Sequence, residues 1–149
     1  MTVEIARRLG LVLEPKTVVA LRGDLGAGKT RFVQGIALGL GVPSSDRVSS
    51  PSFELVHEHL GGRLALYHVD LYRLPEGPPE PELGLEEYLY GEGVCAVEWA
   101  DRMEAWLPPR RLDVELLVVG SRTREIRFDA LGELHGRILS RLREQLVSR

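Results

Sequence analysis

The chain has 149 residues, 44% of them hydrophobic and 28% charged, and a formal net charge of -3. This composition and length are typical of a soluble globular protein with one core, so we expect a single domain over residues 1–149. The negative charge argues against broad, sequence-independent binding of nucleic acid, and every apolar run is far shorter than the roughly 20 residues that span a bilayer. Charged residues near the N-terminus interrupt any secretory signal, so we expect a cytoplasmic protein.

Apolar spacing predicts a helix, a strand and a second helix in the first part of the chain. A short amphipathic helix precedes Gly10, and the β-branched run over residues 17–22 predicts a strand buried on both faces, as in parallel sheets. Apolar residues at helical spacing predict a helix over residues 29–40, which Gly41 ends. The expected order is therefore strand, glycine-rich loop, helix.

The rest of the chain predicts two antiparallel hairpins on either side of a buried strand. Strand-like runs flank Gly61 and Gly62, and a two-residue Gly-Gly connection is a strong hairpin signal. The remaining predicted elements are a short helix over residues 85–90, a strand over 94–99 that contains the single Cys95, a hairpin of residues 111–119 and 123–128, and an amphipathic helix over 131–147. We expect an α/β fold with a mixed central sheet, parallel core strands, antiparallel hairpins and flanking helices.

The stretch "GDLGAGKT", residues 23–30, matches the phosphate-loop pattern G-x-x-x-x-G-K-[ST] between a predicted strand and a predicted helix. Glycines let successive backbone N–H groups face one anion, and the helix N-terminus adds about half a positive charge. Lys29 is placed to reach the β- and γ-phosphates, and the Thr30 hydroxyl is placed to bind Mg²⁺. The residues predicted to bind the nucleotide here are Asp24, Leu25, Gly26, Ala27, Gly28, Lys29, Thr30 and Arg31.

Two further questions about this loop are which nucleotide base it binds and which carboxylate lies near the metal. Guanine-specific switches usually read their base with Asn-Lys-x-Asp, and the chain has no asparagine, so we predict ATP. An acidic residue near the metal should follow a buried strand, and both Asp70 and Glu98 stand in that position. Chain physics alone does not rank the two carboxylates.

Four motifs occur in order along most of the chain: "GDLGAGKT" (23–30), "SSPSF" (49–53), "HVDLYRL" (68–74) and "VEWAD" (97–101). With these motifs the chain resembles the TsaE (YjeE) ATPases of bacterial threonylcarbamoyladenosine biosynthesis. The first motif is shared by a vast superfamily, whereas "HVDLYR" and "EW" after it are far more restrictive. The resemblance implies a P-loop NTPase-like fold.

The resemblance also ranks the carboxylates. It implies that Glu98 helps Thr30 to hold Mg²⁺ and that Asp70 orients or deprotonates the attacking water. Asp70 and Lys29 are then the two catalytic residues. It further implies a switch-like loop that contacts the γ-phosphate through Ser52, where the family usually has threonine. A serine keeps the hydroxyl but lacks the methyl group that limits its rotamers.

The resemblance implies that slow ATP hydrolysis serves a larger complex. Family members work with the TsaB and TsaD subunits, and the ATPase resets this complex between cycles of tRNA modification, so contact with tRNA is indirect. Two rival functions stay open: a small-molecule kinase, and a nucleotide-dependent interaction switch with little turnover. The longest irregular segment, residues 75–84, has no arginine, which argues against the arginine-rich lid of a kinase.

Three groups of side chains are given structural roles by the sequence. We expect His57, His59 and His68 to be strand-surface histidines rather than a zinc site. Tyr72 is expected in the core. Arg73 is expected in an ion pair.

Overall fold

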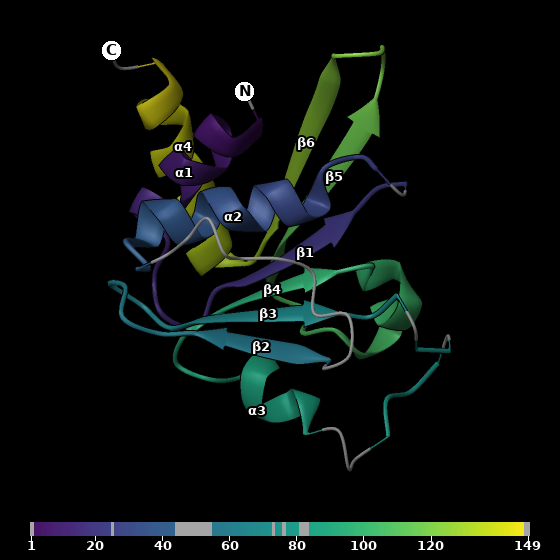
Figure 1. The fold of residues 1–149 in the computed structure, drawn as a ribbon. Helices are drawn as coiled ribbons and strands as arrows, with labels where there is room; N and C mark the ends of the chain where they lie inside the picture. Colours follow the sequence, from purple (N-terminus) through teal and green to yellow (C-terminus); the bar gives the residue numbers. More distant parts are fainter. Residues whose placement is uncertain are drawn as a thin grey trace.

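The computed structural model describes residues 2–24, 26–43, 55–72, 74–75, 77–80 and 84–147. Its elements are α1 (Thr2–Val12), β1 (Val18–Arg22), α2 (Lys29–Leu40), β2 (Val56–His59), β3 (Leu66–Asp70), α3 (Leu85–Leu89), β4 (Val94–Glu98), the 3-10 segment η3 (Ala100–Trp106), β5 (Arg111–Val118), β6 (Arg124–Leu131) and α4 (Glu133–Val147). Within these residues the strands form one sheet in the order β2-β3-β4-β1-β5-β6 (Figure 1). Strands β3, β4, β1 and β5 run parallel, and β2 and β6 pair antiparallel at the edges. The predicted mixed α/β sheet is confirmed.

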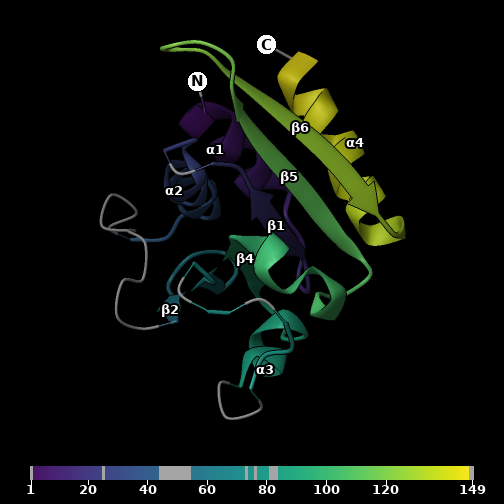
Figure 2. The ribbon, with the colours of Figure 1, turned by 90° about the vertical axis from the view of Figure 1, so that its right-hand side faces the viewer.

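Strand β1 lies near the middle of the sheet because its side chains are apolar on both faces. Val19 and Leu21 pack into a core that α1, α2 and α4 cover, whereas Val18 and Ala20 pack into a second core with α3 and η3. Figure 2 shows α2 and α3 on opposite sides of the central strands. This two-sided burial is what the unbroken β-branched run predicts.

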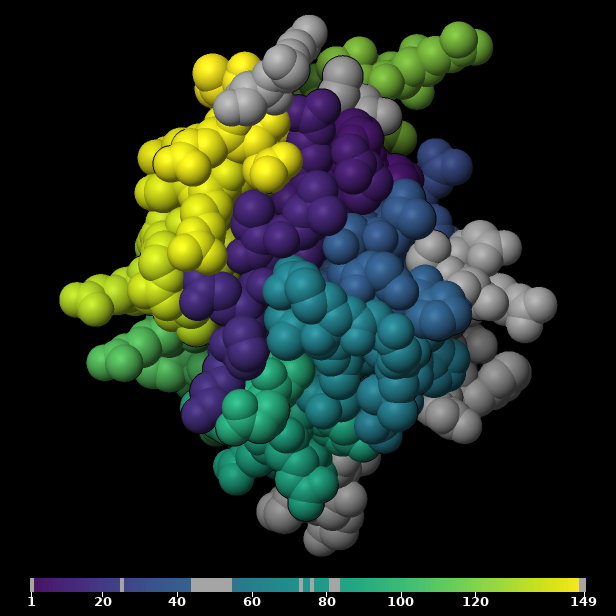
Figure 3. Space-filling model, turned by 90° about the vertical axis from the view of Figure 1, so that its left-hand side faces the viewer, coloured from purple at the N-terminus to yellow at the C-terminus, as the bar shows by residue number. Residues whose placement is uncertain are grey.

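Helix α2 is held close to α1 by glycines at the crossing. A Cβ atom on Gly39 would lie 2.1 Å from the carbonyl oxygen of Arg7, and one on Gly10 would lie 2.6 Å from that of Ile36. Figure 3 shows α1 lying between α2 and α4 on this side of the molecule. The close approach fixes the direction of α2, and therefore the position of the glycine-rich loop at its N-terminus.

The predicted two-residue turn between β2 and β3 is wrong. The strands end at His59 and begin again at Leu66, so residues 60–65 connect them. The glycines there allow close packing rather than a tight turn: a Cβ atom on Gly62 would lie 2.7 Å from the Leu40 carbonyl oxygen. The same carbonyl accepts a hydrogen bond from the Arg63 N–H at 2.7 Å, which ties the loop to the C-terminal end of α2.

The second hairpin, β5–β6, reaches beyond the rest of the sheet in Figures 1 and 2. Helix α4 follows it and buries Ile138 and Leu142 against the core, as the predicted apolar stripe requires. Leu146 belongs to the same stripe but is 37% exposed. Among the helices described, none combines the length and the apolar character that crossing a membrane requires.

Candidate nucleotide site

The glycine-rich loop joins the carboxyl end of β1 to the first turn of α2, at the right-hand side of Figure 1. Gly26 and Gly28 have φ angles of 83° and 106°, which place them in the region that favours glycine. The Ala27 N–H donates to the Asp24 carbonyl at 3.0 Å, so the chain turns back on itself within the loop. Leu25 lies outside the described residues.

Lys29 lies beneath this loop with its side chain almost fully buried, at 5% exposure. Its Nζ donates to the carbonyl oxygens of Gly23 at 2.6 Å and Asp24 at 3.0 Å, and it lies 3.9 Å from the centre of the Trp99 ring. Burial lowers the pKa of Lys29, and the negative charge of nearby carboxylates, Glu98 first, opposes that shift. The ammonium group is therefore held at the loop by two uncharged carbonyl acceptors, which a negatively charged phosphate could replace.

Glu98 ends β4 directly beside the first turn of α2. The Thr30 hydroxyl donates to both carboxylate oxygens of Glu98, at 3.1 and 3.0 Å. A third contact comes from Nε2 of His68, which bonds to Oε2 of Glu98. The carboxylate is only 3% exposed and is held on two sides.

Asp70 lies next to Glu98 because β3 and β4 are parallel and the two residues are paired in register. Its Oδ1 accepts a hydrogen bond from the Tyr72 N–H at 3.0 Å, which orients the carboxylate at the strand end. Asp70 and Glu98 both act electrostatically on Lys29. The structure thus places both predicted carboxylates at the carboxyl end of the parallel strands, where the loop also lies.

The donor atoms at this edge suit a magnesium ion. Thr30 and Glu98 offer oxygen atoms, and Mg²⁺ usually binds through one or two carboxylates together with substrate phosphates and water. Within the described part of the chain, no group of three or more His, Cys, Asp and Glu side chains could hold a metal without such help. The oxygen atoms of Thr30 and Glu98 fit a metal that takes its other ligands from phosphate and water.

A cavity of about 860 Å³ adjoins the loop. Loop residues line one side, and Arg31 stands at its edge, exposed on the first turn of α2. The other walls come from the start of α1, the β5–β6 hairpin and the end of α4, and include Thr2, Val3, Ile5, Arg122, Thr123, Arg124, Ile126, Phe128 and Leu146. Sequence reasoning did not find these residues, because no local motif links three segments that lie so far apart in the chain.

Comparison with known proteins identifies the family. The family model described as "Threonylcarbamoyl adenosine biosynthesis protein TsaE" matches residues 1–126. The chain belongs to the TsaE family. A relative from Bacillus subtilis (strain 168), named "tRNA threonylcarbamoyladenosine biosynthesis protein TsaE", is 44% identical over 131 residues, which cover 88% of this chain and 80% of the relative.

Further relatives and a solved structure agree. A TsaE protein of the same name from Treponema pallidum (strain Nichols) is 43% identical over 118 residues, covering 79% of this chain and 85% of that protein. The solved structure titled "Crystal structure of Bacillus subtilus YdiB" superposes with a TM-score of 0.81 at 39% identity, covering 97% of this chain and 88% of that one. The fold of this TsaE family member is therefore that of a solved relative.

Two side chains of the TsaE motifs lie where the sequence did not predict them. Tyr72 is 46% exposed rather than in the core, because it follows the end of β3 and its ring packs against Trp99, 4.9 Å between centres. His68 is fully buried rather than at a strand surface, because it faces α2 and bonds to Glu98. Ser52 and Arg73, which the TsaE motifs also contain, lie outside the described residues.

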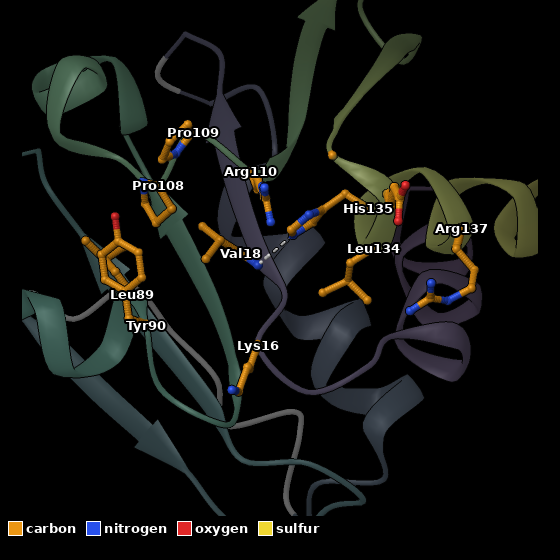
Figure 4. A pocket seen from close by; sticks show the side chains of 12 residues that line it. Lys16, Val18, Leu89, Tyr90, Pro108, Pro109, Arg110, Leu134, His135 and Arg137 are labelled. Atoms are coloured by element: carbon orange, nitrogen blue, oxygen red, sulfur yellow. Dashed lines mark hydrogen bonds between the residues drawn. The ribbon is translucent and has the colours of Figure 1, made fainter.

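A second cavity, of about 940 Å³, lies at the opposite end of the sheet (Figure 4). Its lining includes Lys16 before β1, Val18 at the start of β1, Arg110 before β5, and His135 in the first turn of α4. The Val18 N–H donates to Nε2 of His135 at 3.2 Å, drawn as a dashed line in Figure 4. Of the residues predicted for the nucleotide, those that the structure describes do not line this cavity.

Proposed function

We propose that this protein is the MgATP-binding and ATP-hydrolysing subunit of the machinery that makes threonylcarbamoyladenosine in tRNA. One observation supports this most strongly: a buried Lys29 ammonium lies under a glycine-rich loop, with the Thr30–Glu98 pair and Asp70 beside it. A cation, loop amides and strand-end carboxylates on one edge of a parallel sheet are the groups that phosphoryl transfer requires. The names of the relatives, which refer to tRNA threonylcarbamoyladenosine biosynthesis, supply the pathway.

Each group has a definite task in this proposal. The loop amides and Lys29 bind the phosphates, with Lys29 exchanging the Gly23 and Asp24 carbonyls for phosphate oxygens. Thr30 and Glu98 hold Mg²⁺, which when bound neutralises charge that develops on the β- and γ-phosphate oxygens. The cavity between α1 and the β5–β6 hairpin receives the ribose and adenine, because it is the hollow that continues from the loop.

Asp70 acts on the attacking water. Its carboxylate orients the water and accepts a proton as the oxygen bonds to the γ-phosphorus. The bond from that phosphorus to the β–γ bridging oxygen breaks, and the products are ADP and inorganic phosphate. Because the Asp70 carboxylate is itself held by the Tyr72 N–H, its direction is set before the nucleotide arrives.

The proposal extends to partners. The ATPase works in the cytoplasm with TsaB and TsaD, contacts tRNA only through that complex, and resets the complex between cycles.

The test replaces Asp70 with alanine. We expect Asp70→Ala to bind ADP and ATP as the wild type does, and to lose phosphate release both alone and with TsaB and TsaD. Formation of threonylcarbamoyladenosine in repeated cycles should be lost with it. Asp129→Ala is the matched control, because Asp129 is an exposed aspartate on β6, away from the loop.

Two outcomes would contradict the proposal. Normal modification by Asp70→Ala despite lost hydrolysis would instead support an interaction switch. Phosphate release that requires an added small-molecule acceptor would support a kinase.

A further inference from the structure

His68 is a fully buried histidine that bonds to a carboxylate. It lies on β3 two residues before Asp70, and its Nε2 bonds to Oε2 of Glu98 on the neighbouring strand. Its other ring nitrogen, Nδ1, is buried and has no hydrogen-bond partner among the described residues. A buried polar atom without a partner costs stability, so an apolar side chain would fill this position better if packing were all that mattered.

The contact explains what the imidazole contributes. The Thr30 hydroxyl bonds to both oxygens of Glu98. If this were the only contact, the carboxylate could still rotate about its Cγ–Cδ bond. The bond from His68 to Oε2 distinguishes the two oxygens and removes that freedom. Groups that orient a metal-binding carboxylate in this way are a general feature of metal sites.

We propose that His68 is a positioning residue that fixes the Glu98 carboxylate for Mg²⁺. This inference rests on the proposed function, since it assigns His68 a task within the same MgATP site. Backbone pairing supports it: Asp70 and Glu98 are in register on parallel strands, so His68 is held diagonally across from Glu98 by the sheet itself. His68 acts through Glu98 and does not contact the nucleotide.

The experiment measures Mg²⁺ affinity rather than activity. A fluorescent ADP analogue is titrated into the wild type, His68→Leu and His68→Gln, first in EDTA and then with increasing Mg²⁺. His68→Leu fills the space without a donor, and we expect the Mg²⁺ dependence to shift to concentrations about 10- to 100-fold higher, with ADP affinity in EDTA unchanged. His68→Gln keeps an N–H donor and should recover most of the shift.

His59→Leu is the matched control. The His59 ring lies on the adjacent strand β2, 6.3 Å between its centre and that of the His68 ring. The substitution therefore removes a neighbouring histidine and leaves the bond from His68 to Glu98 in place. We expect His59→Leu to keep the wild-type Mg²⁺ dependence.

The outcomes separate this inference from the function on which it rests. A wild type whose ADP binding does not respond to Mg²⁺ would overturn the proposed function. A normal Mg²⁺ response in His68→Leu would overturn only the role of His68. That role would also be overturned if His68→Leu weakened binding equally in EDTA and in Mg²⁺, or if His68→Gln were as impaired as His68→Leu.

Discussion

The two ends of the sheet carry cavities of similar size, but the buried polar side chains near them bond to different partners. The cavity of about 860 Å³ adjoins the glycine-rich loop, whereas the larger one, of about 940 Å³, lies at the amino end of β1. Each end also has a buried histidine, His68 at one and His135 at the other. His68 bonds to a carboxylate and His135 accepts from a backbone N–H. The group to which the histidine bonds, rather than the volume of the cavity or the residue type, distinguishes the candidate nucleotide site from a purely structural region.

Strand direction explains why the two ends differ. In open α/β sheets ligands bind at the carboxyl ends of the parallel strands, where loops and helix N-termini converge. Here β1, β3 and β4 are parallel, so the glycine-rich loop, Asp70 and Glu98 all lie at the carboxyl end of these strands. At the amino end, the first residue of β1 bonds to the first turn of α4: the Val18 N–H donates to His135.

The largest expected effect comes from replacing Lys29 with alanine. Hydrogen bonds to charged groups contribute about 1.5–3 kcal/mol each, so losing contacts to two phosphates should weaken ATP binding by more than about 100-fold. The chain offers an apt control in its other lysine, Lys16, which lies at the opposite end of the sheet and pairs with Glu92 at 3.5 Å. Isothermal titration calorimetry should show that Lys16→Ala binds ATP with the affinity of the wild type. Equal affinity of Lys29→Ala and the wild type would remove the basis for the phosphate site.

His135 should affect stability and leave nucleotide binding alone. His135→Leu leaves the buried Val18 N–H without its acceptor, which should lower the free energy of unfolding by about 1–3 kcal/mol in urea titrations near neutral pH. ATP affinity should not change, because the residue lies at the other end of β1. A loss of ATP affinity in a folded His135→Leu protein would break the division between the two ends.

The same variant gives a pH test. Burial lowers the pKa of His135 below 6.5, so the unfolded chain binds the proton more readily than the folded one. The contribution of His135 to stability is therefore complete above about pH 6.5 and is lost as the pH falls below that value, by at most about 1.4 kcal/mol per pH unit. Between pH 7.5 and 5.5 the wild type should lose more stability than His135→Leu. The pKa of His59 is also lowered by burial, and its effect remains in both proteins.

Local features were predictable from sequence because they depend on neighbouring residues. The strand β1, the glycine-rich loop and the helix α2 follow from apolar spacing and the loop motif. Cys95 is buried, as its apolar run indicates, and this burial raises the pKa of its thiol to about 12. Tertiary contacts decided the rest. Gly62 signals a turn by its type but serves close packing on α2. His68 is buried in the folded protein and bonds to Glu98, a residue 30 positions away. The walls of the cavity beside the loop come from distant segments that carry no shared pattern.

The smallest expected effects compare the cavities directly. Arg31 and Arg122 line the cavity beside the loop, and neither is among the residues predicted to hold the metal. If the nucleoside lies there, Arg31→Ala or Arg122→Ala should weaken ADP binding by a few-fold, about 0.5–1 kcal/mol, since both side chains are exposed and water screens their charge. Arg110→Ala makes the same change at the larger cavity and should leave ADP affinity as it is. Weaker ADP binding by Arg110→Ala, with no effect of Arg31→Ala or Arg122→Ala, would place the nucleoside at the wrong end of the sheet for the loop and would contradict the assignment of the two cavities.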